Sequence, residues 1–312
     1  MSKRALIAVG GNSLIRAGEK GTITDQLANA RRTAAAIVGL IKARYDVVVT
    51  HGNGPQVGAA LLRSERASDQ VYSLPLDVCD AATQGEIGYL LQQSLKNELA
   101  AAGLSTQVVG VLTQVVVSPD DPAMQKPNKP VGPFYSKADA EERRDRLGWQ
   151  IVEDAARGYR RVVPSPEPLA IVEEEIIGHL QSRGVLVIAV GGGGIPVVDR
   201  GGQLEGIEAV IDKDRASALL ASRLGVDLFI ISTDTDYVYL EYKKPTQRRL
   251  ENVTVAEVAE HQAAGHFPPG NMGPKIEAAL RFLRADGGEV IITSFEHIVD
   301  AVAGRAGTHI RR

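Results

Sequence analysis

The sequence is poor in cysteine and in aromatic side chains, and its charge is nearly balanced. Its 312 residues include a single cysteine, Cys79, so neither an intramolecular disulfide nor a CxxC metal site can form. Aromatic residues make up 4% of the chain, too few for the stacking surface of a single-stranded nucleic-acid binder. Thirty-five Lys and Arg against 38 Asp and Glu give a net charge of −3. The basic excess typical of nucleic-acid-binding proteins is therefore absent.

Long apolar runs are also missing. The first apolar run ends at Gly10-Gly11, which is too short for a signal peptide or a membrane span. No other run approaches ~20 apolar residues, so we expect a cytoplasmic protein without a membrane partner. With 44% hydrophobic residues, a chain of this length can nevertheless bury a sizeable core.

The signatures of several enzyme classes do not occur. A P-loop needs a Gly-Lys pair, which the chain lacks, and the GxGxxG spacing fails after both Gly52 and Gly191. There is no HExxH and no GxSxG motif, and the six histidines are scattered along the chain. These absences argue against a P-loop ATPase, a dinucleotide dehydrogenase, a zinc hydrolase and a serine hydrolase.

Short aliphatic runs alternate with longer stretches of helical periodicity. Because the short runs are apolar at successive positions, they are typical of strands buried on both faces of a parallel sheet. The candidate strands are Ala5–Val9, Asp46–Thr50, Gln107–Leu112, Val185–Val190, Asp227–Ser232 and Glu289–Thr293. The predicted helices cover 23–44, 55–68, 83–102 and 215–224, a segment opened by a Thr254-x-x-Glu257 capping box, and one opened at Asn271. This alternation predicts an α/β fold, a three-layer α/β/α sandwich with an open, mainly parallel central sheet.

One stretch departs from this pattern. Eight of the fifteen prolines lie between Pro119 and Pro168, where they flank a strongly charged segment, 137–161. Proline has no N–H group to donate, so the stretch cannot supply central strands. We interpret residues 118–168 as a lid or small subdomain that stands off the main sheet, because loops of this length usually have a function. The alternative is a surface excursion without a function.

Glycine-rich turns follow three of the predicted strands. The first strand leads into Gly10-Gly11-Asn12, the second into Gly52-Asn53, and the fourth into a run of four glycines that includes Gly192 and Gly193. Backbone N–H groups of such turns can approach an anion closely, and the N-terminus of a following helix adds its positive dipole end. Three such turns favour an anion site. The alternatives are ordinary tight turns and, for the four glycines, a flexible hinge.

Three lysines lie in unusual backbone settings. Lys213 stands beside Asp214, which we expect to cap the following helix and to hold lysine ammonium groups in position. Lys275 follows Pro274, predicted at the first helical position, and Lys129 lies between prolines of the inserted stretch. Each lysine alone is more often a solvated surface charge. Together with the anion-binding turns they suit phosphoryl transfer, which needs positioned cations more than a nucleophile.

At these residues the chain resembles the carbamate kinase branch of the amino-acid kinase family. The resemblance covers nearly the whole length, and the sequence motifs that carry it are long and specific. They include Gly10-Gly11-Asn12, His51-Gly52-Asn53-Gly54-Pro55-Gln56-Val57-Gly58, Leu112–Val117, Lys129-Pro130-Val131-Gly132-Pro133-Phe134, Val162–Pro166, Gly191–Pro196, Ala209–Asp214 and Ala264–Phe267. The resemblance implies a single domain over 1–312, a protruding subdomain and a homodimer. It implies the reaction ATP + carbamate ⇌ ADP + carbamoyl phosphate with Mg²⁺, often run towards ATP in arginine catabolism.

The resemblance also implies roles for individual residues. Lys213 and Lys275 would contact the transferring phosphoryl group, Lys129 would reach in from the subdomain, and Asp214 would organise the lysines. The turns at Gly10, Gly11, Asn12, Gly52, Asn53, Gly192 and Gly193 would bind carbamate and phosphate. Asp236, Tyr237 and Met272 would lie near the nucleotide, and Mg²⁺ would be held mainly by nucleotide phosphates. Asn271 stands where the family's Gly-Ser-Met-x-Pro-Lys motif usually has serine, so the resemblance defines the adenine contacts there less well.

Two other functions stay open at this point. One is a related kinase acting on a different small acid or phosphate, such as acetylglutamate, UMP or isopentenyl phosphate, although those larger substrates need more room than backbone and glycine provide. The other is a non-catalytic nucleotide sensor on the same fold. A sensor predicts the loss of at least one of the three lysines, and all three are present.

Overall fold

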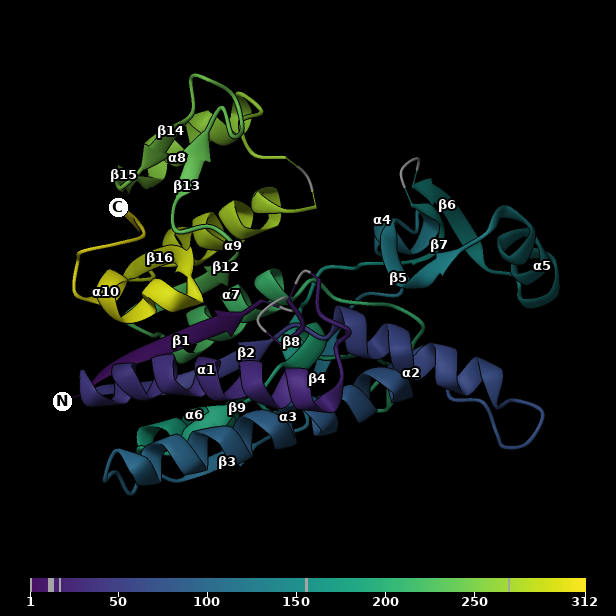
Figure 1. Ribbon diagram of the computed structural model, residues 1–312, viewed down its shortest axis with the longest axis horizontal. Helices are drawn as coiled ribbons and strands as arrows, with labels where there is room; N and C mark the ends of the chain where they lie inside the picture. The colour runs from purple at the N-terminus through teal and green to yellow at the C-terminus, as the bar shows by residue number, and fades with distance from the viewer. Residues whose placement is uncertain (1, 11–13, 17, 155–156, 269) are drawn as a thin grey trace.

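An eight-stranded sheet lies at the centre of the computed structural model, which describes residues 2–10, 14–16, 18–154, 157–268 and 270–312 (Figure 1). Its strand order is β15-β17-β16-β12-β1-β2-β9-β3. In chain order these strands are β1 (Lys3–Val9), β2 (Tyr45–His51), β3 (Val108–Gly110), β9 (Leu186–Ile188), β12 (Leu228–Thr233), β15 (Asn252–Thr254), β16 (Glu289–Ser294) and β17 (Thr308–Arg311). Every pair is parallel except β16 with β17.

Helices cover both faces of this sheet. Ala5, Ile7 and Val9 of β1 pack in one core with α1 (Ile23–Lys42), α3 (Leu76–Ala101) and α10 (Ile298–Val302). Leu6 and Ala8 point the other way, because side chains alternate along a strand. They join a second core with α6 (Glu174–Ser182), α7 (Lys213–Leu224), α8 (Val255–Ala263) and α9 (Met272–Arg284). The predicted three-layer sandwich and its open, mainly parallel sheet are confirmed. All six predicted strands lie in that sheet, and β15 and β17, which were not predicted, complete it.

The structure adds short strands that the sequence analysis did not predict. A four-stranded sheet has the order β11-β10-β4-β8, built from β4 (Gln114–Val116), β8 (Ala170–Ile171), β10 (Ile195–Asp199) and β11 (Leu204–Gly206). A hairpin joins β13 (Val238–Leu240) to β14 (Arg248–Leu250). Most of these strands have two or three residues, too few to show a periodic pattern.

The proline-rich stretch contributes no strand to the central sheet. It forms a separate three-stranded antiparallel sheet, β5-β7-β6, from β5 (Lys129–Tyr135), β6 (Gln150–Asp154) and β7 (Gly158–Val163). Pro130 and Pro133 lie on β5, an edge strand, where a missing N–H group is tolerated. We call residues 129–163, with α5 (Lys137–Leu147), the outer lobe. In Figure 1 it stands away from the main body, on the right. The short α4 (Pro122–Gln125) precedes it.

Three helix starts differ from the predictions. α3 begins at Leu76 rather than near Thr83. α7 is capped by Asp212, whose carboxylate accepts hydrogen bonds from the backbone N–H groups of Asp214 and Arg215, so the predicted cap at Asp214 is wrong. α9 begins at Met272, which makes Pro274 its third residue rather than its first. The capping box at Thr254 is confirmed. Within the described ranges, no helix combines the length and the apolar character that a membrane crossing requires.

Candidate active site

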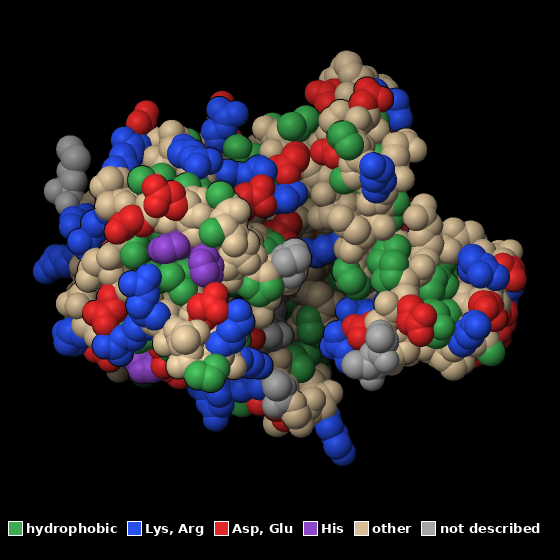
Figure 2. Space-filling view, turned by 90° about the horizontal axis from the view of Figure 1, so that it is seen from above, with side chains coloured by type: hydrophobic (Ala, Val, Ile, Leu, Met, Phe, Trp, Pro, Cys, Tyr) green, Lys and Arg blue, Asp and Glu red, His purple; other side chains and the backbone are tan. Residues whose placement is uncertain are grey.

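A cleft of about 830 Å³ lies between the main body and the outer lobe. Figure 2 shows it as a hollow between the two parts of the surface. Its walls come from the start of α2 (Gly54–Arg66), β5, the loop before α7 and the start of α9. These segments are far apart in sequence. They meet here because α2 follows the carboxyl end of β2, whereas α7 and α9 come just before β12 and β16 and so begin at the edge where these parallel strands end. That edge is where α/β folds commonly bind ligands.

The three predicted lysines all line this cleft. The Nζ atom of Lys213 lies 2.5 Å from Oδ1 of Asp214, and the Nζ atom of Lys275 lies 3.1 Å from Oδ2 of the same carboxylate. Asp214 is thus buried between two ammonium groups, as the sequence analysis expected. The side chains of Lys213 and Lys275 are only 12% and 13% exposed, so their charges are held in fixed positions.

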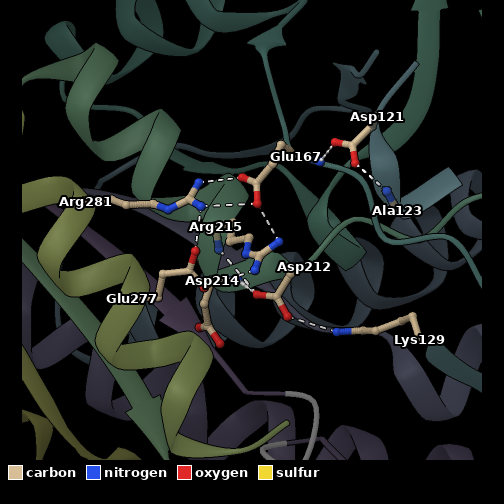
Figure 3. Close-up of polar contacts among 9 residues, drawn as sticks. All are labelled: Asp121, Ala123, Lys129, Glu167, Asp212, Asp214, Arg215, Glu277 and Arg281. Atoms are coloured by element: carbon tan, nitrogen blue, oxygen red, sulfur yellow. Dashed lines mark hydrogen bonds and ion pairs between the residues drawn. The ribbon is translucent and has the colours of Figure 1, made fainter. Parts of the chain in front are cut away.

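Lys129 reaches the cleft from the outer lobe. Its ammonium group lies 2.9 Å from Oδ2 of Asp212, the residue that caps α7 (Figure 3). Asp212 was not predicted as a site residue. Aspartate is a favoured N-cap residue, so the sequence did point to a cap here. It did not decide between Asp212 and Asp214, which lie one on each side of Lys213. The contact joins the outer lobe to the helix that carries Lys213.

The start of α7 is fixed to α9 by a network of charges. Arg215 contacts Glu277 at 3.0 Å and Glu167 at 2.6 Å. Arg281 contacts the same two carboxylates, each at 2.5 Å, so Glu167 and Glu277 both bridge the two arginines (Figure 3). Since Lys213 begins α7 and Lys275 lies in the first turn of α9, this network helps to fix the distance between the two lysines.

The cleft carries an excess of positive charge. Five cationic side chains and two carboxylates line it among the described residues, which leaves a net charge of three positive units (five minus two). The cations are Lys129, Arg157, Arg160, Lys213 and Lys275, and the anions are Asp212 and Asp214. Arg157 and Arg160 come from the outer lobe, and the sequence analysis did not single them out. An electropositive cleft of this kind attracts polyanions such as nucleotide phosphates.

Burial and mutual contact shift the ionisation of these groups. Burial lowers the pKa of Lys213 and the nearby Lys275 lowers it further, while Asp214 opposes both effects. Burial works against ionisation of Asp214, yet the two ammonium groups outweigh it and hold the pKa of that carboxyl well below its usual range. The pKa of Arg160 is lowered by burial and by the charge of Arg157. The carboxylate therefore stays charged and keeps both lysines in place.

The glycine turns contribute in different ways. Gly52, Asn53 and Gly192 line the cleft, whereas Gly10 and Gly193 are not among its lining residues. Gly11 and Asn12 lie outside the described residues. A Cβ atom on Gly193 would meet the carbonyl oxygen of Ile211 at 2.4 Å, so this glycine permits close backbone packing behind the site. Gly10 follows β1 directly, and α1 begins at Ile23 as predicted. Gln56 near the start of α2 donates a hydrogen bond of 2.9 Å to Gln26 near the start of α1, so these two helix starts lie side by side.

The predicted nucleotide residues lie outside the cleft lining. Asp236 and Tyr237 follow the carboxyl end of β12. There, Oδ1 of Asp236 lies 3.0 Å from Nδ1 of His297. Met272 is the first residue of α9 and packs against the core on that side of the sheet. Of the two segments, only the start of α9 also contributes to the cleft, through Asn271, Pro274 and Lys275.

Residues 3–294 match the model of the amino acid kinase family. The chain belongs to the amino acid kinase family. Within that family it is similar to carbamate kinases. It is 47% identical to the one from Thermococcus kodakarensis, with 99% of each chain covered, and 48% identical to the one from Staphylococcus haemolyticus, with 100% of each covered.

Solved structures of the family have the same fold. A carbamate kinase from Giardia lamblia bound to AMP-PNP has a TM-score of 0.94 at 43% identity, covering 99% of this chain and 98% of that one. A UMP kinase from Bacillus anthracis has a TM-score of 0.52 at 14% identity, covering 99% and 96%. The second likeness shows the shared fold alone.

Proposed function

We infer that this member of the amino acid kinase family is a carbamate kinase, catalysing ATP + carbamate ⇌ ADP + carbamoyl phosphate. The observation that carries the inference is the convergence of Lys129, Lys213 and Lys275 on one cleft that Gly52 and Gly192 also line. The full-length similarity to carbamate kinases supports it, and likenesses to other kinases of the fold stand at far lower identity. The proposed reaction is a phosphoryl transfer, although the chain has no P-loop motif.

The charges of the cleft fit the chemistry of this reaction. A carbamate oxygen forms a bond to the γ-phosphorus while the bond from that phosphorus to the bridging oxygen breaks, and ADP leaves. Negative charge spreads over the phosphoryl oxygens during transfer, and fixed cations stabilise it without having to reorganise. We propose that Lys213 and Lys275 contact the transferring group, that Lys129 approaches it from the outer lobe, and that Asp214 positions Lys213 and Lys275.

The substrates occupy different parts of the sheet edge in this proposal. Carbamate has four heavy atoms, so a pocket of glycine and backbone at Gly10, Gly11, Asn12, Gly52, Asn53, Gly192 and Gly193 suffices for it and for the phosphate. The nucleotide base lies near Asp236, Tyr237 and Met272, beyond the cleft lining. The relative from Giardia lamblia bound to AMP-PNP supports nucleotide binding by this fold.

We propose that Mg²⁺ arrives with the nucleotide phosphates. Both carboxylates that line the cleft are engaged by lysines, and the described part of the chain contains no group of three or more His, Cys, Asp or Glu side chains that could hold a metal. The described residues therefore form no metal cage of their own, and Mg²⁺ commonly binds through substrate phosphates.

Four further properties belong to the same proposal. The enzyme works in the cytoplasm, its reaction is of the kind often run towards ATP in arginine catabolism, residues 118–168 act as a lid over the cleft, and the enzyme forms a homodimer. A groove beside α3 offers a surface for the homodimer, because Tyr89 on α3 and Leu112 after β3, which are 62% and 58% exposed, both line it. Light scattering of the purified protein tests the dimer, and a monomer at micromolar concentration contradicts it.

A coupled assay tests the function directly. Purified protein with Mg²⁺, ADP and carbamoyl phosphate should produce ATP, and no turnover refutes the proposal. Lys213→Ala should lower kcat at least a hundredfold, by analogy with the loss of one oxyanion-stabilising group, while the melting curve stays cooperative. Lys42→Ala is the control, because Lys42 is an exposed lysine in the last turn of α1. Near-wild-type activity of Lys213→Ala contradicts the proposed site.

A further inference from the structure

The side-chain amide of Asn53 is held in a single orientation by α3. Its Nδ2 atom donates to Oδ1 of Asp80 and, at 2.8 Å, to Oγ1 of Thr83. All three side chains are buried, with residue exposures of 3%, 3% and 1%. Asn53 also lines the cleft, and it is the N-cap residue of α2 without using its side chain for capping. The amide therefore serves something other than the start of that helix.

The hydroxyl group of Thr83 settles which end of the amide faces the helix. Its proton is donated to the backbone carbonyl of Asp80 at 2.7 Å. The oxygen can then only accept, so the atom of Asn53 that faces it must be the nitrogen. Both N–H groups of the amide are thus used, one by Thr83 and one by Asp80. The side-chain oxygen is left over, and it has no hydrogen-bond donor among the described residues.

Gly192 closes the other side of this cluster. A Cβ atom at position 192 would lie 2.4 Å from Nδ2 of Asn53 and 2.6 Å from Oδ1 of Asp80, so only glycine allows the loop to approach this closely. Gly192 lines the same cleft as Asn53. The cluster is therefore packed from two directions, and the amide cannot turn without breaking both of its hydrogen bonds.

We propose that Asn53, positioned by Asp80 and Thr83, is a specificity-determining residue that accepts a hydrogen bond from the amino group of carbamate. The inference rests on the proposed function. Carbamate differs from a carboxylate such as acetate by an N–H donor at the same place, and a fixed, otherwise unpaired acceptor recognises that difference. A buried polar group left without its partner costs free energy, so substrates lacking the donor bind less well.

The test compares two phosphoryl donors in the direction of ATP formation. Acetyl phosphate has a methyl group where carbamoyl phosphate has the amino group, so it has nearly the same size but no N–H. We expect the wild type to prefer carbamoyl phosphate in kcat/KM. Thr83→Val and Asp80→Ala release the amide and should reduce this preference about tenfold, the factor expected from one hydrogen bond, with the KM for ADP unchanged. Thr83→Ser keeps the hydroxyl and should retain the preference.

The outcomes separate this inference from the proposed function. A wild type that uses neither donor refutes the function and the inference together. A wild type that uses both donors equally well overturns the inference and leaves the function standing. The same holds if Thr83→Val lowers kcat/KM for both donors by one common factor, which is what a merely structural role predicts. Valine has nearly the shape of threonine, so this variant decides the question even if Asp80→Ala fails to fold.

Discussion

The ammonium group of Lys275 lies 3.1 Å from the carboxylate of Asp214, a residue 61 positions earlier in the chain. Lys275 lies in the first turn of α9, where the helix dipole disfavours a positive charge. The ion pair offsets that cost within the protein itself. The same carboxylate holds Lys213, so one acidic side chain fixes two of the three lysines in the cleft.

Replacing this carboxylate should change the pH dependence of catalysis. Asp214 raises the pKa of Lys213 against the effects of burial and of Lys275. In Asp214→Asn that support is lost, so the pKa of Lys213 falls further and the lysine loses its proton at lower pH. We expect the alkaline limb of the kcat profile to move towards neutral pH and kcat to fall at least tenfold. Asp69→Asn, at an exposed position, is the control, and an unshifted alkaline limb in Asp214→Asn contradicts this assignment.

The contribution of the outer lobe can be isolated at Lys129. Its ion pair with Asp212 is partly exposed, with 35% of the lysine side chain accessible, so removing it should cost less than about 1 kcal/mol of stability. Asp212 keeps its two bonds to the start of α7. Lys129→Ala should nevertheless lower kcat tenfold or more if its charge stabilises the transferring phosphoryl group. Lys126→Ala, an exposed lysine just before the lobe, should leave kcat unchanged. Equal activities of the two variants would exclude a catalytic charge at Lys129.

Gly192 provides a test of the packing around Asn53. Its φ of +71° and the contacts that a Cβ atom would make both oppose a side chain there. Gly201 has nearly the same φ, +69°, but nothing lies within 4 Å of its Cβ position. Gly201→Ala should therefore lose about 1 kcal/mol from backbone strain alone, whereas Gly192→Ala should lose roughly 1–3 kcal/mol more and lower kcat. Denaturant unfolding of the two variants measures the difference, and equal losses would show that the predicted overlap does not occur.

The buried His51 should make the fold sensitive to acid. Burial lowers its pKa from 6.5 to about 4, and the charge of Lys213 acts in the same direction, while the carbonyl of Gly52 opposes them. Between these values the unfolded chain binds a proton that the folded chain does not, so stability decreases as the pH falls from 6.5 to 4. The difference of 2.5 pH units corresponds to at most about 3 kcal/mol.

A pair of histidine variants separates this effect from other titrations. In His51→Asn, the difference in unfolding free energy between pH 6.5 and pH 4 should shrink by that amount. His179→Asn, at an exposed position in α6, should leave the difference as it is in the wild type. If both variants keep the wild-type slope, His51 is not the group that titrates.

Much of the fold could be predicted from local patterns. The uninterrupted apolar runs at Ala5–Val9 and, within Asp227–Ser232, at 228–231 identified strands covered on both faces, because such coverage favours apolar side chains at successive positions. Prolines kept the 118–168 stretch out of the central sheet for an equally local reason. Most of the two-residue and three-residue strands could not be found, since so few residues carry no period. The strands β3 and β9 were found because each lies inside a longer apolar run.

The candidate site was predicted less completely. The sequence pointed to three lysines and to the turns at Gly52 and Gly192, all of which line the cleft. It placed the cap of α7 on Asp214 instead of Asp212, because either aspartate satisfies the same local preference. It gave no role to Asp80 and Thr83, which lie within a long helix and differ in no local way from other polar helix residues.

The sequence by itself determined most of the segments that become strands and helices, and the strands that glycine-rich turns follow. These properties depend on neighbours in the chain and on the periodicity of apolar side chains. Only the tertiary structure decided that Lys129, Lys213 and Lys275 meet, that one carboxylate serves two of them, and which end of the Asn53 amide faces α3. Those relationships join residues dozens of positions apart, so they exist only once both faces of the sheet are packed and the outer lobe closes one side of the cleft.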